Sequence, residues 1–151
     1  MRVTDALLGE HGLFYTLFDQ ISDATVNAPD QVPALAHALA KTLASHAEVE
    51  EATLFPALRP HLGPLGPIAV MEAEHRQIEE LIALIADTDE PGMLHRQVEA
   101  LIEISIGHFA KEEGILFHLA GRFLSDEEME KLGSAWVDFR GVNLQPLGCA
   151  A

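Results

Sequence analysis

Cysteine, basic residues and long apolar runs are scarce in this chain, and each scarcity excludes a class of protein. The single cysteine, Cys149, excludes a disulfide framework or a thiolate metal site within one chain, so nitrogen and oxygen must hold any bound metal. Nine Lys and Arg against 24 Asp and Glu give a net charge of −15, which repels nucleic acid and anionic lipid. No segment reaches 18 uninterrupted apolar residues, and the start has no signal-peptide pattern. We therefore expect a cytoplasmic protein that binds neither nucleic acid nor membranes.

Sustained period-two alternation is also missing, which excludes an extensive β-sheet. The chain has 151 residues, 48% of them apolar, which predicts one domain over residues 1–151 with a single sizeable core. Apolar residues recur at steps of three and four over long windows, so the predicted fold class is all-α. Breaks rich in Pro and Gly separate four long helices, which we place from Thr4 for about 20 residues and over about 31–58, 67–86 and 92–121.

Short connections between long helices are typical of an up-down-up-down four-helix bundle, here over about 4–121. The expected details include an N-cap at Thr4 and a fraying helix end at Pro56. Ser125 and Glu128 form a capping box for a short fifth helix over about 125–140, and residues 141–151 read as a loose tail.

Each of the four apolar stripes contains a His in a position that the helical period assigns to the core, and two stripes contain a Glu one turn later. A buried carboxylate or imidazole without a partner is costly, so such a set needs a common partner. At about 1.5 Å of rise per residue, the four His reach nearly the same height along the bundle. The residues are His11, His46, Glu50, His75, His108 and Glu112.

The two halves of the chain also resemble each other. The segment HAEVEEATLF from His46 matches HFAKEEGILF from His108 at five of ten positions, and EHGLF from Glu10 resembles EHRQI from Glu74. A duplicated helical hairpin would give a central site that receives two His and one Glu from each half. Such a site suits two metal ions.

These residues resemble the bacterial hemerythrin-like, or HHE cation-binding, domain over nearly the whole chain. The resemblance includes the six ordered residues, LFP at 54–56 and LSDEEMEKLG at 124–133. It implies a four-helix bundle with a non-haem centre of two Fe ions joined by an oxo or hydroxo bridge. It also implies that Glu50 and Glu112 bridge the metals, with His11, His46, His75 and His108 as terminal ligands.

One departure from the oxygen-carrying hemerythrins bears on function. Those proteins have a second His one turn before the one in the third helix, where this chain has Met71. Two octahedral irons offer twelve positions, of which two bridging Glu, four His and an oxygen bridge fill ten. The resemblance thus implies about one open position per iron, and the same ligand set resembles bacterial iron-centre repair proteins linked to nitric oxide and oxidative stress. We expect a protein that binds, senses or reacts with O2, peroxide or NO, including weak oxidoreductase activity, rather than a bulk oxygen carrier.

Two other functions remain open. One is iron storage or donation to damaged iron centres, which would need an iron-acceptor or redox protein partner. The other is a metal-free helical interaction module in which the polar core residues form a hydrogen-bonded network. Manganese or a mixed pair of metals also suits the ligand set.

Several further residues near the six are candidates for lesser roles. Tyr15 could hydrogen-bond a bound oxygen species or ligate, although packing at the stripe edge suits it better. Glu72 suits a surface or outer role, Glu79 could approach the site or lie on the surface, and Cys149 suits an inert tail thiol. Glu51 and Glu113 are expected to be exposed or to make an outer hydrogen bond. The remaining histidines are poor ligand candidates, namely His37, His61, His95 and His118.

Overall fold

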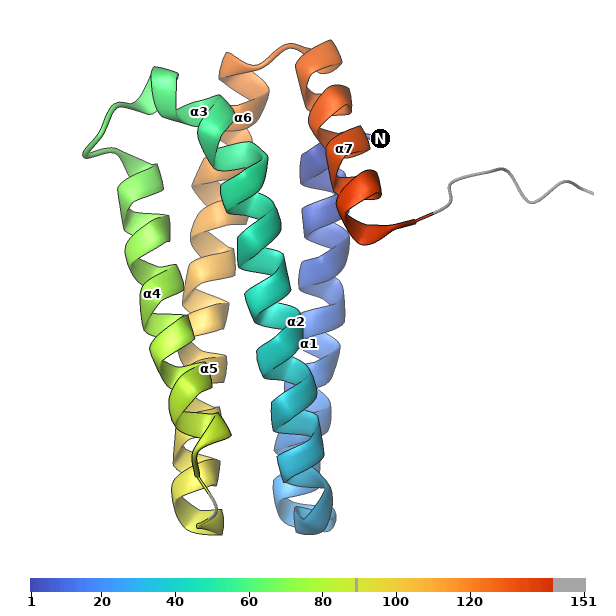
Figure 1. Cartoon of the computed structure of the whole chain (residues 1–151), viewed down its shortest axis with the longest axis vertical. Helices are drawn as coiled ribbons and strands as arrows, with labels where there is room; N and C mark the ends of the chain where they lie inside the picture. Colours follow the sequence, from blue (N-terminus) through green and yellow to red (C-terminus); the bar gives the residue numbers. More distant parts are fainter. Residues whose placement is uncertain (89, 143–151) are drawn as a thin grey trace, which may run out of the picture.

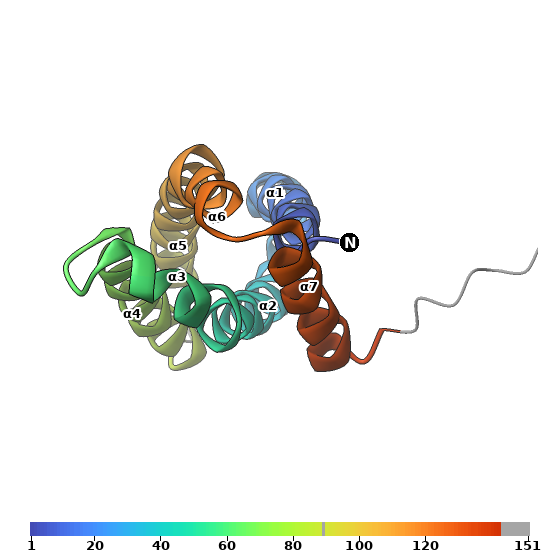
Figure 2. The same cartoon turned by 90° about the horizontal axis from the view of Figure 1, so that it is seen from above.

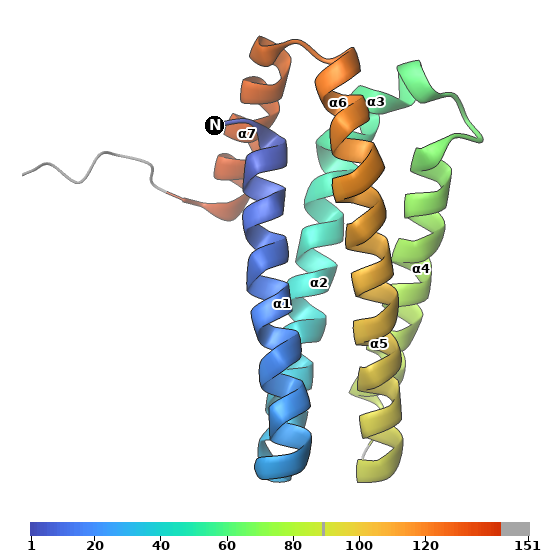
Figure 3. The ribbon, with the colours of Figure 1, turned by 180° about the vertical axis from the view of Figure 1, so that it is seen from behind.

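The computed structural model describes residues 1–88 and 90–142, and within these ranges the secondary structure is helical with no β-strand. Four long helices run alternately down and up, as Figures 1 and 3 show, and seen from above they occupy the corners of a square (Figure 2). The predicted all-α, up-down-up-down arrangement is therefore confirmed. The four are α1 (Val3–Asn27), α2 (Val32–Ala52), α4 (Pro67–Ala86) and α5 (Pro91–Lys111).

Shorter elements connect and extend these helices. A 3-10 turn, η1 (Pro29–Gln31), joins α1 to α2, and α3 (Leu54–Leu62) crosses the end of the bundle toward α4 (Figure 2). A π-helical segment, η2 (Glu112–Leu116), follows α5 and continues into α6 (Phe117–Phe123). The last described helix is α7 (Asp126–Arg140), which lies outside the square and packs against α1 (Figures 1 and 2).

Two of the predicted helix details are wrong. The helix expected over 31–58 is interrupted at Thr53, whose backbone leaves the helical region with φ −122° and ψ −73°. Its hydroxyl donates to the Val49 carbonyl at 2.6 Å, and Pro56 then lies in the first turn of α3, where a missing N–H costs little. Thr4 is not the N-cap, because α1 begins at Val3 and the Arg2 backbone N–H donates to the Asp5 carboxylate.

The π segment changes which residues face the core beyond Glu112. A regular α-helix would bury Ile115 and Leu119, but the side chain of Ile115 is 52% exposed. Leu116 and Ala120 are buried instead. A π turn contains an extra residue, so the inward face moves on by one position.

The core consists of two apolar clusters, and the buried His and Glu residues predicted from the sequence lie between them. One cluster fills the half of the bundle near the α1–α2 and α4–α5 connections and includes Phe14, Leu39 and Leu101. The other lies under α3 and α6 and includes Leu7 and Phe55. Because both flanking clusters are apolar, the polar residues between them are cut off from solvent.

The fifth helix of the prediction, 125–140, is confirmed as α7 together with its capping box. The Ser125 N–H donates to Glu128 at 2.8 Å, and the Glu128 N–H donates to the Ser125 hydroxyl at 3.3 Å. Gly133 lets α7 approach the start of α1, because a Cβ there would lie 2.2 Å from the Met1 carbonyl oxygen. Most of the predicted tail, including Cys149, lies outside the described residues. No described helix is long and apolar enough to cross a membrane.

Candidate metal centre

The structure brings all six polar core residues predicted from the sequence to one level of the bundle. Each is at most 2% exposed. One histidine comes from each long helix, Glu50 comes from α2, and Glu112 opens the π segment. Their atoms form two groups, each with its members' ligand atoms within 4.8 Å of one another. The groups are His11, His46, Glu50 and Glu112 (the His11/His46 site) and His75, His108, Glu50 and Glu112 (the His75/His108 site).

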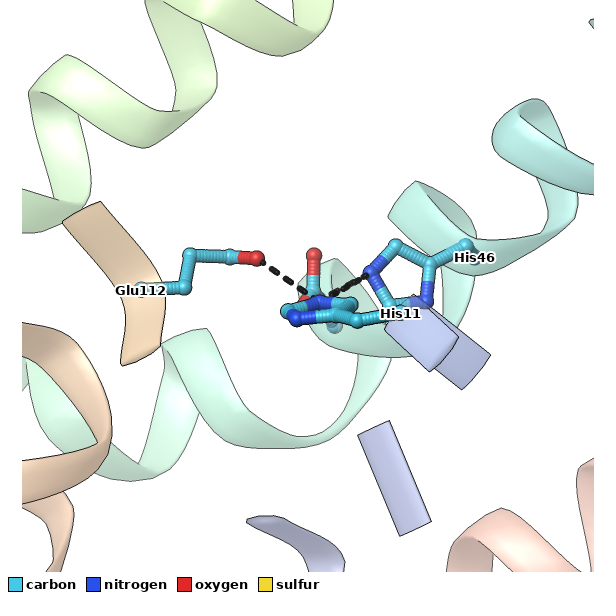
Figure 4. A group of neighbouring side chains, drawn as sticks. His11, His46 and Glu112 are labelled. Carbon is cyan, nitrogen blue, oxygen red and sulfur yellow. Dashed lines mark hydrogen bonds and ion pairs between the residues drawn. The ribbon is translucent and has the colours of Figure 1, made fainter. Parts of the chain in front are cut away.

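The histidines face each other in pairs through their Nε2 atoms. In the His11/His46 site these atoms are 3.3 Å apart, and in the His75/His108 site they are 3.1 Å apart. Figure 4 shows the first pair with Glu112 extending toward His11 from another helix. Aromatic rings pack flat against one histidine of each pair, Phe109 on His11 and Phe55 on His75, and so restrict the imidazole planes.

The two glutamates are shared between the sites. Glu50 has Oε1 3.4 Å from Nε2 of His46 and Oε2 3.4 Å from Nε2 of His75. Glu112 has Oε2 3.3 Å from Nε2 of His11 and Oε1 3.4 Å from Nε2 of His108. Each carboxylate therefore spans from one histidine pair to the other.

Four further carboxylates, called the outer carboxylates below, each accept a hydrogen bond from the outer nitrogen, Nδ1, of one histidine. Because a carboxylate only accepts hydrogen bonds, each Nδ1 carries a hydrogen, and whenever the imidazole is neutral its Nε2 directs a lone pair into the site. The distances from Nδ1 to the carboxylate oxygen are 2.8 Å for His11–Glu113, 2.6 Å for His46–Glu10, 2.8 Å for His75–Glu51 and 3.0 Å for His108–Glu74.

Sequence reasoning found half of this outer set. The expectation of an outer hydrogen bond for Glu51 and Glu113 is confirmed, while the roles of Glu10 and Glu74 were missed. The signal that could have found them is the repeat itself, since each directly precedes a histidine in the EHGLF and EHRQI segments. Their partners, however, are histidines of the neighbouring helix, which a single-helix pattern cannot reveal.

The donor set fits a cation. All four oxygens of Glu50 and Glu112 are buried without a hydrogen-bond partner, and they face the Nε2 atoms of four imidazoles. Such a concentration of buried acceptors is unfavourable unless positive charge lies between them. Imidazole nitrogen with carboxylate oxygen suits iron, manganese and zinc among the common metals. The six residues could therefore hold two ions.

Where no cation is bound, protons supply part of the positive charge that these buried acceptors need. Burial, reinforced by the negative charge of Glu50, raises the pKa of Glu112 to about 8, and burial also raises the pKa of Glu50. Burial lowers the pKa of His75, but the negative charge of Glu50 and the hydrogen bond to Glu51 outweigh it and raise the value to about 9. Burial and the charge of His75 lower the pKa of His108 to about 3. Metal binding would displace these protons.

The structure places the remaining candidates outside both groups. The Tyr15 hydroxyl donates to Glu113 at 3.4 Å, and its ring packs edge-on to Phe18 and Phe109. Glu72 pairs with Arg59 of α3, and Glu79 is exposed. The other histidines, His37, His61, His95 and His118, lie on the outer faces of the bundle and in neither group.

Fold and donor set together define a helical-bundle protein with a buried His and Glu site for cations. A model of the hemerythrin HHE cation binding domain matches residues 2–120, and the chain belongs to this family. The solved structure of a hemerythrin HHE cation binding domain-containing protein from Mycobacterium kansasii is similar, with a TM-score of 0.73 and 26% identity. The match covers 93% of this chain and 88% of that one.

Two curated relatives are longer proteins. The iron-sulfur cluster repair protein YtfE of Escherichia coli is 30% identical over 92 residues, which are 52% of this chain. A DNA nickase of Nostoc sp. is 26% identical over 149 residues, which are 98% of this chain. Each match spans 42% of the relative's own length.

Proposed function

We propose that this chain is a non-haem di-iron protein that binds, senses or reacts with small oxidants such as O2, peroxide or NO. Its ligands are the six core residues His11, His46, Glu50, His75, His108 and Glu112. When bound, a pair of iron ions supplies electron transfer and open coordination positions for a small ligand. Action in the cytoplasm is part of the same proposal.

The observation that carries the proposal is the spanning geometry of Glu50 and Glu112. Each has one oxygen within 3.4 Å of a histidine in the first pair and the other oxygen within 3.4 Å of a histidine in the second. A carboxylate that serves a single ion has no need to reach both pairs. A metal-free hydrogen-bonded core is disfavoured because the four oxygens have no donors.

Met71 supports small-molecule chemistry over reversible oxygen carriage. It lies one turn before His75 and is 3% exposed within the apolar cluster under α3. Its side chain offers a thioether where the oxygen-carrying hemerythrins have an imidazole. With six protein ligands and an oxygen bridge for two ions, about one position per ion is left for an exogenous ligand.

Metal analysis joined to visible spectroscopy tests the proposal. Protein purified without oxygen and loaded with Fe²⁺ should hold two iron ions per chain. After oxidation, azide, peroxide or NO should each change the visible spectrum, because they reach open positions on the metal. Iron well below two per chain, with no uptake on titration, contradicts the di-iron centre, and preferential retention of manganese would reassign the metal.

Matched histidine variants locate the ions. His46→Ala should lower the iron content from two to about one and weaken the azide response accordingly, because it removes a ligand from one of the two sites. His37→Ala is the control, since His37 lies on the same helix α2 but is exposed. Equal iron contents in the two variants would contradict the assignment of His46.

Iron donation to damaged iron centres is the second candidate. The similarity to YtfE, whose name describes iron-sulfur cluster repair, favours it, although that match spans only part of each protein. Loaded protein mixed with an apo iron-sulfur protein, sulfide and a thiol reductant should then rebuild the cluster faster than free Fe²⁺ with a chelator does in the same mixture. Retention of both ions against a chelator would exclude donation. The net charge of −15 gives no support for transferring the nickase activity to this chain.

A further inference from the structure

Glu10 is held more completely than the other outer carboxylates. Its Oε1 accepts from Nε of Arg140 at 2.7 Å and from the indole N–H of Trp136 at 2.9 Å. Its Oε2 accepts from Nη2 of Arg140 at 3.0 Å and from Nδ1 of His46 at 2.6 Å. Arg140 thus donates a hydrogen bond to each oxygen of Glu10, the carboxylate that orients His46.

Within the part of the chain that the structure describes, no Arg donates hydrogen bonds to both oxygens of any of the other three outer carboxylates. Glu74, which orients His108, pairs with the flexible Lys111 at 2.6 Å, and the Lys111 side chain is 44% exposed. Among the described residues, Glu51 and Glu113 pair with no Lys or Arg. A planar guanidinium fixes two oxygens at once, whereas an ammonium acts as a mobile point charge.

Arg140 and Trp136 both belong to α7, and α7 is itself packed against the rest of the bundle. Met129 is buried in the apolar cluster under α3, and Gly133 lies against the backbone of Met1 and Arg2. Arg140 also hydrogen-bonds the Ser45 hydroxyl of α2, one residue before His46. The guanidinium therefore joins α1, α2 and α7 beside the His11/His46 site.

We propose that α7 is a positioning element for one metal site, acting from Arg140 and Trp136 through Glu10 onto His46. The inference rests on the proposed metal centre but adds to it, because the family match ends at residue 120, before α7 begins. A fixed Glu10 fixes the plane of the His46 imidazole and keeps its Nε2 lone pair aimed inward. The His11/His46 site is thereby better preorganised than the His75/His108 site, so the two sites bind ions with unequal affinity.

Trp136 gives the proposal a direct readout. It is the single tryptophan of the chain and is hydrogen-bonded to Glu10, so its fluorescence reports on the His11/His46 site. Zn²⁺ is a suitable probe because it accepts the same ligands, does not oxidise and has no unpaired electrons to quench fluorescence. Metal-free protein titrated with Zn²⁺ in a calorimeter should show two binding steps, and the tighter step should change the Trp136 fluorescence.

Arg140→Gln should weaken the tighter step about tenfold, the low end of what loss of an outer partner costs a metal site, and leave the weaker step within about twofold. Arg140→Lys keeps the charge but not the two-oxygen grip, so it should recover only part of the loss. Should Arg140→Gln fail to fold, Trp136→Phe removes one donor to Glu10 while keeping an aromatic ring. It should weaken the same calorimetric step to a smaller extent.

Two control variants separate positioning from stability. Arg2→Gln removes the ion pair between Arg2 and Asp126, which also joins α1 to α7 but touches no outer carboxylate. It should leave both Zn²⁺ steps unchanged, whatever it does to the unfolding temperature. Lys111→Gln should weaken the other step, because Lys111 contacts Glu74 of the His75/His108 site.

The possible results distinguish this inference from the proposed function. If wild-type protein binds two Zn²⁺ ions but Arg140→Gln alters neither step, or both equally, the positioning role is overturned and the metal centre stands. The same follows if Arg2→Gln weakens the tighter step as much as Arg140→Gln. A wild-type chain that binds no ion overturns both.

Discussion

Glu50 and Glu112 bring four buried carboxylate oxygens into one site, and none of the four accepts a hydrogen bond. The two residues come from equivalent places in the two halves of the chain, four residues after His46 and His108. The helix is also disturbed just after each of them, by the break at Thr53 and by the π segment. Burying these four oxygens without donors therefore carries a free-energy cost that a bound cation would offset.

A substitution at Glu112 should separate stability from metal binding. Above the raised pKa of Glu112, which is about 8, Glu112→Gln replaces two buried charged acceptors by one acceptor and a donor group beside Nε2 of His11. We expect the metal-free protein to gain about 1–3 kcal/mol in free energy of unfolding, measured in urea. The same variant should hold at most one iron. Glu103→Gln, an exposed change on α5, serves as the control and should do neither.

The π segment predicts that Leu116, rather than Ile115, contributes to the stability of the core, whereas a regular helix would predict the reverse. Leu116→Ala should lower the free energy of unfolding by about 2–5 kcal/mol, because Leu116 is 1% exposed in the apolar cluster under α3. Ile115→Ala should change it by no more than about 0.5 kcal/mol, because Ile115 is half exposed. Urea unfolding of the two metal-free variants decides between the registers, and a larger loss for Ile115→Ala would refute the π assignment.

Gly133 should be required for the seating of α7. Gly133→Ala places a Cβ 2.2 Å from the Met1 carbonyl oxygen, so α1 and α7 must separate, at a cost of about 1–3 kcal/mol. Gly121→Ala in α6 is the matched control, because no atom outside its own helical turn lies within 4 Å of its added Cβ. That control should gain about 0.5–1 kcal/mol from helix propensity alone. Thermal unfolding of both variants measures the contrast, and equal shifts would mean that the close approach is absent.

The capping box of α7 should depend on pH. Hydrogen bonds from the Ser125 backbone and hydroxyl lower the pKa of Glu128 from 4.5. A carboxylate whose pKa is lowered by folding stabilises the protein above its unfolded pKa, and this contribution is lost as the pH falls through the folded value. Glu128→Gln should therefore be less stable than wild type near neutral pH, and the difference should vanish as the pH falls through the lowered pKa of Glu128. Glu127→Gln removes a charge from the same turn without breaking the box, and an equal pH profile would disprove the coupling.

Ligand candidates could be read from the sequence because a helix repeats every 3.6 residues. A histidine such as His75 in an apolar stripe stands out against Met71 and Ile78, and the pattern needs no knowledge of the neighbouring helices. The bundle followed from the same stripes and the short connections between them. Beyond Glu112 the pattern failed, since the π turn breaks the periodicity on which it depends and Leu116 replaces Ile115 in the core.

The sequence by itself determined the fold class, the six inward polar residues and the two-fold repeat, because each depends on the spacing of residues within one helix. Only the tertiary structure decided which partners hold those residues in place. Glu10 is hydrogen-bonded to a histidine 36 positions away and to Arg140, 130 positions away. Such contacts depend on how helices pack and where chain segments end, and no local period records them. The division of the six residues into two sites, and the difference between those sites, likewise arises only when four helices meet.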